Sequence, residues 1–212
     1  MAGDVSPSWW SRFGARVYDP FLALGERRGM RDRRRALVRG ARGRVLELGA
    51  GTGLNLAHYP DDLDELVLTE PDGPMRAALE RRVARSGSRA RVVAAPAETL
   101  PFANGAFDTV VCTLVLCTVA DAPAAVAEVR RVLAPGGRLL FAEHVRADGR
   151  LGRWQDRLAG PWAAFGQGCR CNRATDALLE RAFRLEQVQR GRWRGMPVVV
   201  QPLVTGAARP VR

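Results

Sequence analysis

The sequence predicts an α/β fold in which helices cover both faces of a doubly wound, mostly parallel sheet. From Gly43 to Val145, short β-rich apolar runs alternate with helical patterns. This alternation is typical of parallel strands joined by crossover helices. The chain has 212 residues, of which 47% are hydrophobic, and this suits a single domain with a substantial core.

The alternating region predicts five strands and three helices. The strands are expected at 44–49, 65–70, 90–95, 107–116 and 138–145. A short helix opens at Leu54, and a longer one at 72–87 has Met75, Leu79 and Val83 on its apolar face. The last helix, 121–134, begins at an Asp cap and ends at the PGG turn of 135–137.

The two flanks of this region are helical and aromatic. Residues 8–39 are predicted to form an amphipathic helix, and residues 150–180 to be helical again. Their aromatic residues are Trp9, Trp10, Phe13, Tyr18, Phe21, Trp154, Trp162 and Phe165. The tail from 183 to 212 is predicted to close the sheet as a β-hairpin. The single domain then divides into a cap (1–42), a core (43–145), a second helical segment (146–182) and the hairpin.

The charge pattern limits the classes of partner. The net charge is +11, and all 33 basic residues are arginines scattered along the chain. The densest run, 27–44, is interpreted as a solvated helix face, with an RNA or lipid contact as the alternative. No stretch approaches the roughly 20 apolar residues of a membrane span, and the N-terminus lacks the apolar core of a signal peptide. A cytoplasmic protein is therefore expected.

The four cysteines do not predict a metal site or a disulfide. Cys112 and Cys117 lie in an apolar strand, where free cysteine usually packs as a small hydrophobe. Cys169 and Cys171 have no second pair of Cys or His residues at a zinc-like spacing. We therefore expect no metal.

A glycine-rich turn follows the first strand in VLELGAGTGLN, residues 45–55. Glycines there permit a tight turn and close approach of a ligand to the backbone. The dinucleotide fingerprint is absent, because Leu54 stands where its third glycine is required, and no phosphate-binding Gly-Lys-Ser/Thr follows. Glu47 precedes the glycines, and Glu70 ends the second strand, where a carboxylate can accept ribose hydroxyls. A positively charged nucleoside without phosphates, S-adenosylmethionine, fits this pattern.

Five motifs in order, VLELGAGTG, LTEPD, PAETLPF, FDTVV and EVRRVLAPGGRLLFAEH, resemble those of the class I S-adenosylmethionine-dependent methyltransferases over about residues 15–145. The resemblance implies a Rossmann-like sheet of seven strands, an N-terminal helical cap and a helical insertion after the fifth strand. It places Gly49, Gly51 and Gly53 at the methionine part of the cofactor and Glu70 at the ribose. It places Pro71 or Met75 near the adenine and Ala97 with Glu98 at the polar edge of that base. The other cofactor residues that it implies are Tyr18, Glu47, Asn55, Thr113 and Leu114.

A narrower resemblance concerns the acceptor. The segments VVCTLVLCTV, PGGRLLFAEHV, W-x-D-x-L, GCRCNR and LLERAF, within residues 109–183, are similar to animal methyltransferase-like proteins that methylate alkyl thiols. Those proteins begin with a hydrophobic anchor that this sequence lacks. The resemblance implies a small, apolar thiol acceptor. O-, N- or C-methylation of a quinone, lipid or natural product is one alternative, and a basic RNA- or membrane-associated protein, bound through the N-terminal helix, is another. The stretch LVLCTVAD has no Asn-Pro-Pro-aromatic motif, which disfavours a nucleic-acid base as acceptor.

Glu143 and His144 end the fifth strand and are the candidate catalytic residues. Successive strand residues point to opposite faces, so only one of them is expected to reach the acceptor. His144 is the hypothetical proton acceptor, with a hydrogen-bonded structural role as the alternative. Cys117 either borders the transfer site or packs. The candidate residues on the substrate side are Trp154, Trp162, Cys169 and Asn172.

Overall fold

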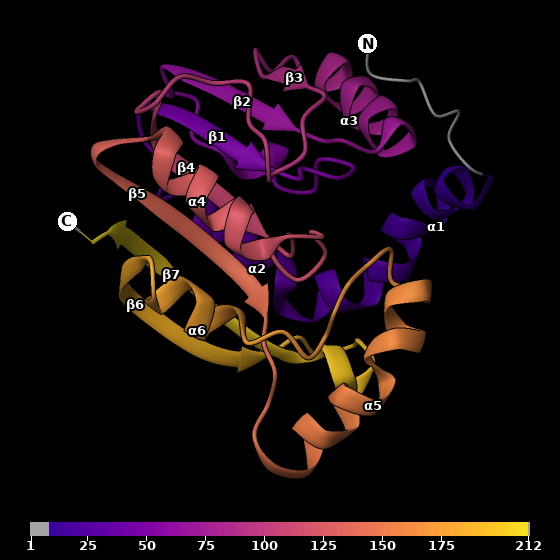
Figure 1. Cartoon of the computed structure of the whole chain (residues 1–212). Coiled ribbons are helices and arrows are strands. Elements are labelled where there is room, and N and C mark those ends of the chain that lie inside the picture. The colour runs from indigo at the N-terminus through magenta and orange to yellow at the C-terminus, as the bar shows by residue number, and fades with distance from the viewer. Residues whose placement is uncertain (1–8, 212) are drawn as a thin grey trace.

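Seven strands form one sheet in the order β3-β2-β1-β4-β5-β7-β6 (Figure 1). The computed structural model describes the backbone of residues 9–211 and the side chains of residues 16–211. The strands are β1 Arg44–Leu48, β2 Glu65–Thr69, β3 Arg91–Val93, β4 Phe107–Thr113, β5 Leu133–His144, β6 Phe183–Arg192 and β7 Pro202–Pro210. The first five pair in parallel, and β7 runs antiparallel to both β5 and β6. The predicted seven-stranded, mostly parallel sheet with a closing hairpin is confirmed.

Helices cover both faces of this sheet. They are α1 Trp9–Gly25, α2 Arg31–Val38, α3 Gly73–Ser86, α4 Ala122–Val132, α5 Gly149–Phe165 and α6 Thr175–Glu180, with short turns η1 Glu26–Met30, η2 Leu56–His58 and η3 Val198–Val200. Leu46, Val110 and Leu139 belong to the core on the α4 side. The next residues along the same strands, such as Val111 and Leu140, pack against Val38 of α2. Burial on both faces explains why the strands are almost continuously apolar.

Several predicted boundaries differ from the structure; the strand expected at 90–95 is only Arg91–Val93, and the helix expected over 8–39 is divided into α1, η1 and α2. The strand expected at 107–116 ends at Thr113, because Leu114 takes a left-handed conformation with φ of 60°. The helix expected to run to 134 ends at Val132, and β5 begins at the next residue and includes the PGG segment. The helical region 150–180 is two helices, and the loop between them carries the GCRCNR segment.

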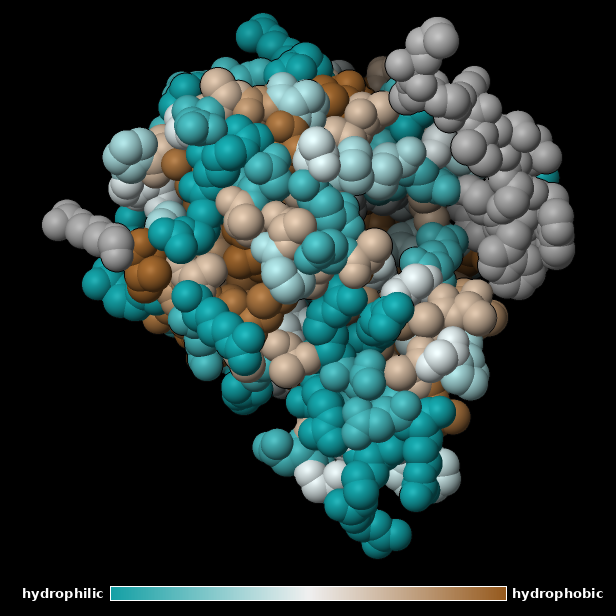
Figure 2. All heavy atoms as spheres, in the orientation of Figure 1, coloured by the Kyte–Doolittle hydropathy of each residue, from teal (hydrophilic) through white to brown (hydrophobic). Residues whose placement is uncertain are grey.

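The arginine side chains of the run 27–44 are mostly solvated, as predicted, and the buried one among them is Arg34. Arg34 is buried and pairs with the buried Glu26 at 3.0 Å. On the face drawn in Figure 2, hydrophilic side chains are spread over most of the surface. Among residues 9–211, no helix is both long enough and apolar enough to cross a membrane. Trp9, Trp10 and Phe13 have side chains outside the described residues.

Candidate active site

The three glycines after β1 all adopt left-handed conformations, with φ of 52°, 57° and 84° at Gly49, Gly51 and Gly53. A Cβ at Gly49 would lie 2.9 Å from Cγ2 of Val115, and one at Gly53 would lie 2.7 Å from Cδ1 of Leu79. These two glycines therefore permit close packing within the protein. At Gly51 the nearest atom to an added Cβ is a ring carbon of Tyr18, 4.0 Å away. Gly51 is thus the glycine that leaves space beside the loop for a ligand.

Glu70 lies at the carboxyl end of β2, beside this loop. Its Oε2 accepts a hydrogen bond from the Gly51 amide at 2.8 Å, and its Oε1 accepts one from the Asp72 amide at 2.9 Å. Burial raises the pKa of Glu70, and the two backbone hydrogen bonds oppose that rise. Each carboxylate oxygen has a further lone pair. The two backbone donors therefore orient a carboxylate that can still accept hydrogen bonds from a ligand.

Glu47 is buried within a polar network of the chain itself. Its oxygens accept hydrogen bonds from Asn55 Nδ2 and the Tyr59 hydroxyl, each at 2.8 Å. Burial raises its pKa to about 7. Asn55 also donates to Thr113 Oγ1 at 3.1 Å and accepts from Arg34 Nη1 at 3.2 Å. The network joins α2 to the ends of β1 and β4, and the sequence analysis did not identify Tyr59 or Arg34 as its members.

Helix α1 lies across the glycine loop. Asp19 accepts hydrogen bonds from Thr52 Oγ1 at 2.5 Å and from Arg82 Nη2 at 2.6 Å, so it ties α1 to the loop and to α3. Tyr18 is beside Gly51, and burial raises its pKa to about 12. The N-terminal helix thus covers the end of the sheet where the resemblance placed the cofactor.

The residues expected around the adenine differ in exposure and in contacts. Met75 and Ala97 are buried and apolar, whereas Pro71 is exposed. Glu98 Oε1 accepts hydrogen bonds from the Ala120 amide at 2.9 Å and the Asp121 amide at 3.3 Å. Glu98 therefore holds the turn before α4, and its contact with an adenine stays a prediction.

The two candidate catalytic residues have different surroundings. Oε1 of Glu143 accepts hydrogen bonds from the Val115 and Leu116 amides and the Cys112 thiol, at 2.9, 3.2 and 3.1 Å. It thereby supports the turn after β4. The ring of His144 stacks on Trp193 with centroids 5.5 Å apart, and burial lowers its pKa to about 4. His144 is therefore neutral near pH 7. Its Nδ1 is buried with no hydrogen-bond partner of normal geometry among the described residues, whereas backbone groups of Pro202 and Val200 act to raise its pKa, and the structural alternative stays a prediction.

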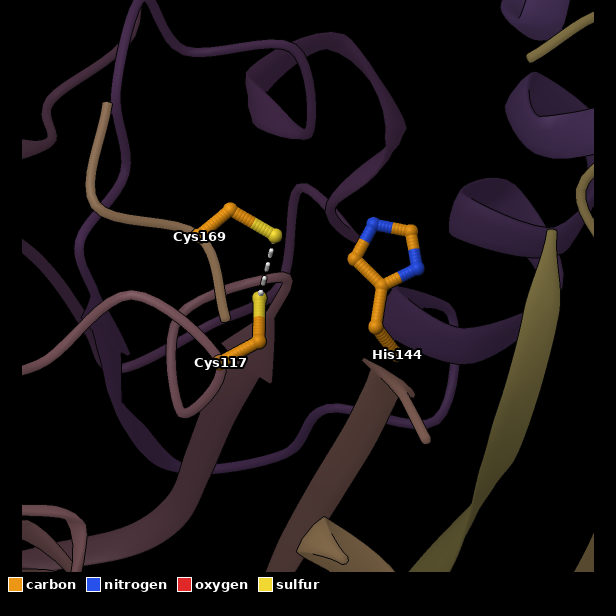
Figure 3. Close-up of side chains that lie close together, drawn as sticks. All are labelled: Cys117, His144 and Cys169. Carbon is orange, nitrogen blue, oxygen red and sulfur yellow. Dashed lines mark hydrogen bonds between the residues drawn. The ribbon is translucent and has the colours of Figure 1, made fainter. Parts of the chain in front are cut away.

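Cys117 and Cys169 lie beside His144, as Figure 3 shows. Their sulfurs are 3.7 Å apart, and both are free thiols. The hydrogen bond with Cys117 lowers the pKa of Cys169 against the effect of burial, and the Trp162 indole and Arg173 act in the same direction. Trp162 Nε1 is buried near the Cys169 thiol and makes no hydrogen bond of normal geometry with the described residues. Cys169 and Trp162, both predicted on the substrate side, are therefore brought together with His144.

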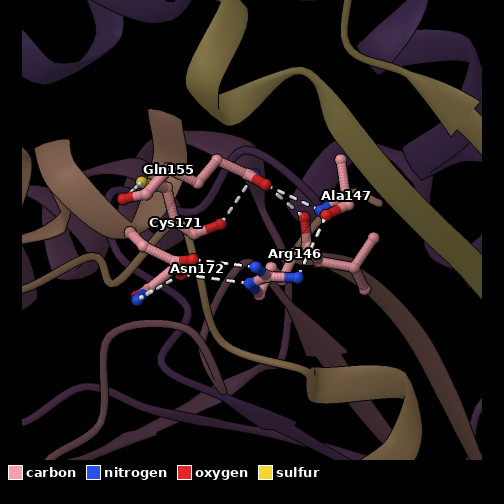
Figure 4. Close-up of polar contacts among 7 residues, drawn as sticks. Arg146, Ala147, Gln155, Cys171 and Asn172 are labelled. Atoms are coloured by element: carbon pink, nitrogen blue, oxygen red, sulfur yellow. Dashed lines mark hydrogen bonds and ion pairs between the residues drawn. The ribbon is translucent and has the colours of Figure 1, made fainter. Parts of the chain in front are cut away.

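The other two predicted substrate residues lie elsewhere. Trp154 is 52% exposed on α5. Asn172 donates a hydrogen bond to Asp156 at 3.3 Å, within a polar network that also pairs Asp156 with Arg146 at 2.7 Å (Figure 4). In the same network, buried Gln155 donates to the carbonyls of Val145, Cys171 and Val199. These residues hold the second helical segment in place and do not join the cysteine cluster.

Comparison with known proteins agrees with this fold. Residues 46–141 match the methyltransferase domain family. Thiol S-methyltransferase TMT1B of Homo sapiens is 40% identical over 150 residues, which are 68% of this chain and 61% of that protein. Demethylmenaquinone methyltransferase of Thermobifida fusca is 34% identical over 149 residues, 68% of this chain and 63% of its own length. The chain thus spans about three fifths of these curated relatives.

Solved structures share the fold over nearly the whole chain. A S-adenosylmethionine-dependent methyltransferase from Thermotoga maritima, described as a possible histamine N-methyltransferase, superposes with a TM-score of 0.70 at 20% identity. The match covers 95% of this chain and 99% of that one. Residues 46–141 thus resemble the methyltransferase domain family, and the chain has the fold of the S-adenosylmethionine-dependent methyltransferases.

Proposed function

We propose that this chain transfers a methyl group from S-adenosylmethionine to the sulfur of a small, largely apolar thiol. The observation that carries the proposal is that His144, the predicted proton acceptor at the end of β5, is a weak base. His144 has a pKa of about 4, and Glu143 Oε1 accepts three hydrogen bonds from the chain. A thiol ionises at about pH 8.5 and needs only a modest shift, whereas a hydroxyl needs a positioned base or a metal.

The residues at the ends of β1 and β2 fit the cofactor. Gly51 leaves space beside Tyr18, and Glu70 presents an oriented carboxylate suited to two hydroxyl groups. Met75 and Ala97 supply buried apolar surface for a planar base. When bound, S-adenosylmethionine supplies an electrophilic methyl group on a sulfonium. The chain's own contribution is to hold the acceptor sulfur in line with that methyl group, a proximity effect of about 7–11 kcal/mol.

An apolar rim supports an apolar acceptor. Phe21 of α1 and Phe165 at the end of α5 meet edge to face, with ring centroids 5.6 Å apart. Their exposed fractions are 40% and 57%, which is high for phenylalanine. Trp162 packs on Phe165 from the same helix at 5.8 Å. The rim therefore connects the surface to the residues around Cys169, and a charged acceptor would find no counter-charge on these three rings.

A second candidate is C-methylation of a demethylated quinol. The similarity to the demethylmenaquinone methyltransferase from Thermobifida fusca favours it, and the same aromatic rim suits a quinone ring. This reaction differs from thiol methylation in what it requires of the protein. A ring carbon becomes nucleophilic only when a quinol hydroxyl loses its proton, so a base would have to act in a region where His144 is a weak one.

The experiment measures S-adenosylhomocysteine formation by the purified chain with S-adenosylmethionine and matched acceptors. The panel pairs alkyl and aryl thiols with the alcohols and amines of the same carbon skeleton and adds a demethylated quinol. We expect turnover on the apolar thiols and little on their alcohol and amine partners. Turnover on the quinol alone would replace the thiol proposal with the second candidate. Equal turnover of charged and apolar thiols would contradict the role of the aromatic rim.

A further inference from the structure

Three buried side chains that carry metal-binding atoms meet at the acceptor side of the sheet. Cys117 comes from the turn after β4, His144 from the end of β5, and Cys169 from the loop after α5 (Figure 3). The two sulfurs and a ring nitrogen of His144 all lie within 4.8 Å of one another. The exposed fractions of Cys117, His144 and Cys169 are 1%, 5% and 7%, so bulk water has little access to their polar atoms.

The geometry of the two sulfurs matches that of a zinc site. A tetrahedral zinc ion with Zn–S bonds of about 2.3 Å holds two thiolate sulfurs about 3.8 Å apart. The Cys117 and Cys169 sulfurs are 3.7 Å apart. The imidazole would have to approach by roughly 1 Å to reach the Zn–N distance of about 2.0–2.1 Å. No backbone rearrangement is needed to bring the two sulfurs to a common ion.

The unmet hydrogen-bonding capacity of the cluster also indicates a ligand. Nε1 of Trp162, the indole next to Cys169, is buried without a hydrogen bond of normal geometry, whereas Nε2 of His144 is the ring nitrogen that faces the two sulfurs (Figure 3). Buried polar groups in native proteins nearly always have a partner. Two thiolates and a divalent ion sum to zero charge, which suits an apolar surrounding. Thiolate and neutral imidazole in a tetrahedral arrangement select zinc among the common ions.

We propose that Cys117, His144 and Cys169 bind a zinc ion and leave its fourth coordination position open to the acceptor's sulfur. Three protein ligands with one open position are the pattern of catalytic zinc sites, whereas structural sites have four. This use of the open position rests on the proposed thiol methylation, but the metal site itself does not. The sequence analysis predicted no metal, because these ligands are far apart in the chain and have no zinc-like spacing.

The zinc site would supply the thiolate that the protein's own side chains do not. The acceptor thiol binds the ion and releases its proton to solvent. The sulfur then donates an electron pair to the methyl carbon, forming the new S–C bond while the methyl–sulfonium bond breaks. S-Adenosylhomocysteine leaves with that electron pair, and the neutral thioether product is a weaker ligand than the thiolate. Zinc and its three protein ligands end the cycle unchanged.

The first experiment tests metal binding alone, with tag-free, full-length protein kept reduced. Zinc content after reconstitution and the spectrum of the cobalt-substituted protein are measured. We expect one ion per chain, with thiolate-to-cobalt charge-transfer bands and the intense visible bands of tetrahedral cobalt. Cys117→Ser and Cys169→Ser should each weaken zinc binding at least about tenfold. The control is Cys171→Ser, since Cys171 is also buried but its sulfur lies 3.8 Å from the Gln155 carbonyl, and binding should stay within about twofold.

Three outcomes would overturn the metal site. These are no zinc in the reconstituted wild type, zinc that both serine variants retain, and a Cys117–Cys169 disulfide formed in place of metal binding under reducing conditions. Circular dichroism and thermal melting of each variant show whether it folds. If a serine variant unfolds, the cobalt spectrum of the wild type still decides the inference, because thiolate-to-cobalt bands report the ligands directly.

The second experiment separates the metal site from the proposed function. An apolar thiol added to the cobalt form should shift the visible bands, and its methyl thioether should not. Removing zinc should lower thiol turnover at least about tenfold while binding of S-adenosylmethionine changes less than about twofold. Zinc bound without any thiol turnover would leave the metal site standing and contradict the proposed acceptor. Thiol turnover that survives zinc removal would support the acceptor and contradict the open coordination position.

Discussion

The two halves of the site differ in how their buried polar groups are satisfied. In the cofactor half, at the ends of β1 and β2, Glu47, Asn55 and Glu70 are all hydrogen-bonded to the chain. In the acceptor half, at the ends of β4 and β5, four buried polar atoms of described residues have no partner: Glu143 Oε2, His144 Nδ1, Trp162 Nε1 and Trp193 Nε1. The protein therefore completes its cofactor half by itself, whereas its acceptor half has the incomplete hydrogen bonding of a site that a ligand completes.

The largest loss of stability is expected from Asn55→Ala, in the cofactor half. The substitution removes one hydrogen-bond partner each from Glu47, Thr113 and Arg34 in one step, and leaves Glu47 with Tyr59 and Arg34 with Glu26. We expect a loss of about 3 kcal/mol in the free energy of unfolding, measured by urea denaturation. The control is Asn172→Ala, which removes one exposed hydrogen bond and should cost less than about 0.5 kcal/mol. Equal losses for the two variants would contradict a prearranged cofactor half.

The pH dependence of stability tests the same network through Glu47. Its folded pKa is raised from 4.5 to about 7 by burial, so the native state holds this proton at pH values where the unfolded state has released it. The free energy of unfolding therefore falls as pH rises from 4.5 to 7, by up to about 3 kcal/mol from this group. Glu47→Gln keeps the side chain neutral. Its stability relative to wild type should rise across that window and level off above pH 7. A stability difference that does not vary with pH would show that Glu47 is not buried as an acid.

The positions of the glycine loop and of Glu70 could be predicted because they depend on local sequence. The glycines stand directly behind the first strand, and Glu70 ends the second, so their positions follow once the two strands are known to be parallel neighbours. The polar network was not predictable in full. Tyr59 and Arg34 reach Glu47 and Asn55 from a loop and a helix, and no local pattern distinguishes them from a surface tyrosine or one of many solvated arginines.

The acceptor half was predicted only in fragments because its contacts are between distant segments. His144 and Cys169 were candidates individually, and Cys117 was more readily interpreted as a packing residue. Their meeting depends on where the loop after α5 crosses the ends of β4 and β5. The end of β4 was also missed, since Leu114 continues the apolar run of the strand while its backbone turns at φ of 60°. Periodicity reports burial but does not report the backbone conformation of a single buried residue.

A third prediction concerns Glu70. In Glu70→Gln one amide oxygen remains for the two backbone donors, Gly51 and Asp72, and the amide NH₂ cannot accept from a ligand hydroxyl. We expect the affinity for S-adenosylmethionine, measured by calorimetry, to fall about 100-fold. The control is Glu98→Gln. A single oxygen of Glu98 accepts both backbone hydrogen bonds, so the amide can replace it, and affinity should change less than about tenfold. A larger loss of affinity in Glu98→Gln than in Glu70→Gln would contradict the proposed contact between Glu70 and the cofactor.

The smallest change in stability is expected from Trp162→Phe, and it tests the acceptor half most directly. Nε1 of Trp162 makes no hydrogen bond in the folded protein, so removing it should cost less than about 1.5 kcal/mol in the free energy of unfolding, a loss of packing only. If that N–H completes the site around the acceptor sulfur, the KM for the thiol should rise several-fold while the affinity for S-adenosylmethionine is unchanged. Trp154→Phe, at a position 52% exposed, is the matched control and should alter neither quantity. If the KM for the thiol is unchanged in Trp162→Phe, the N–H group of Trp162 does not contact the acceptor.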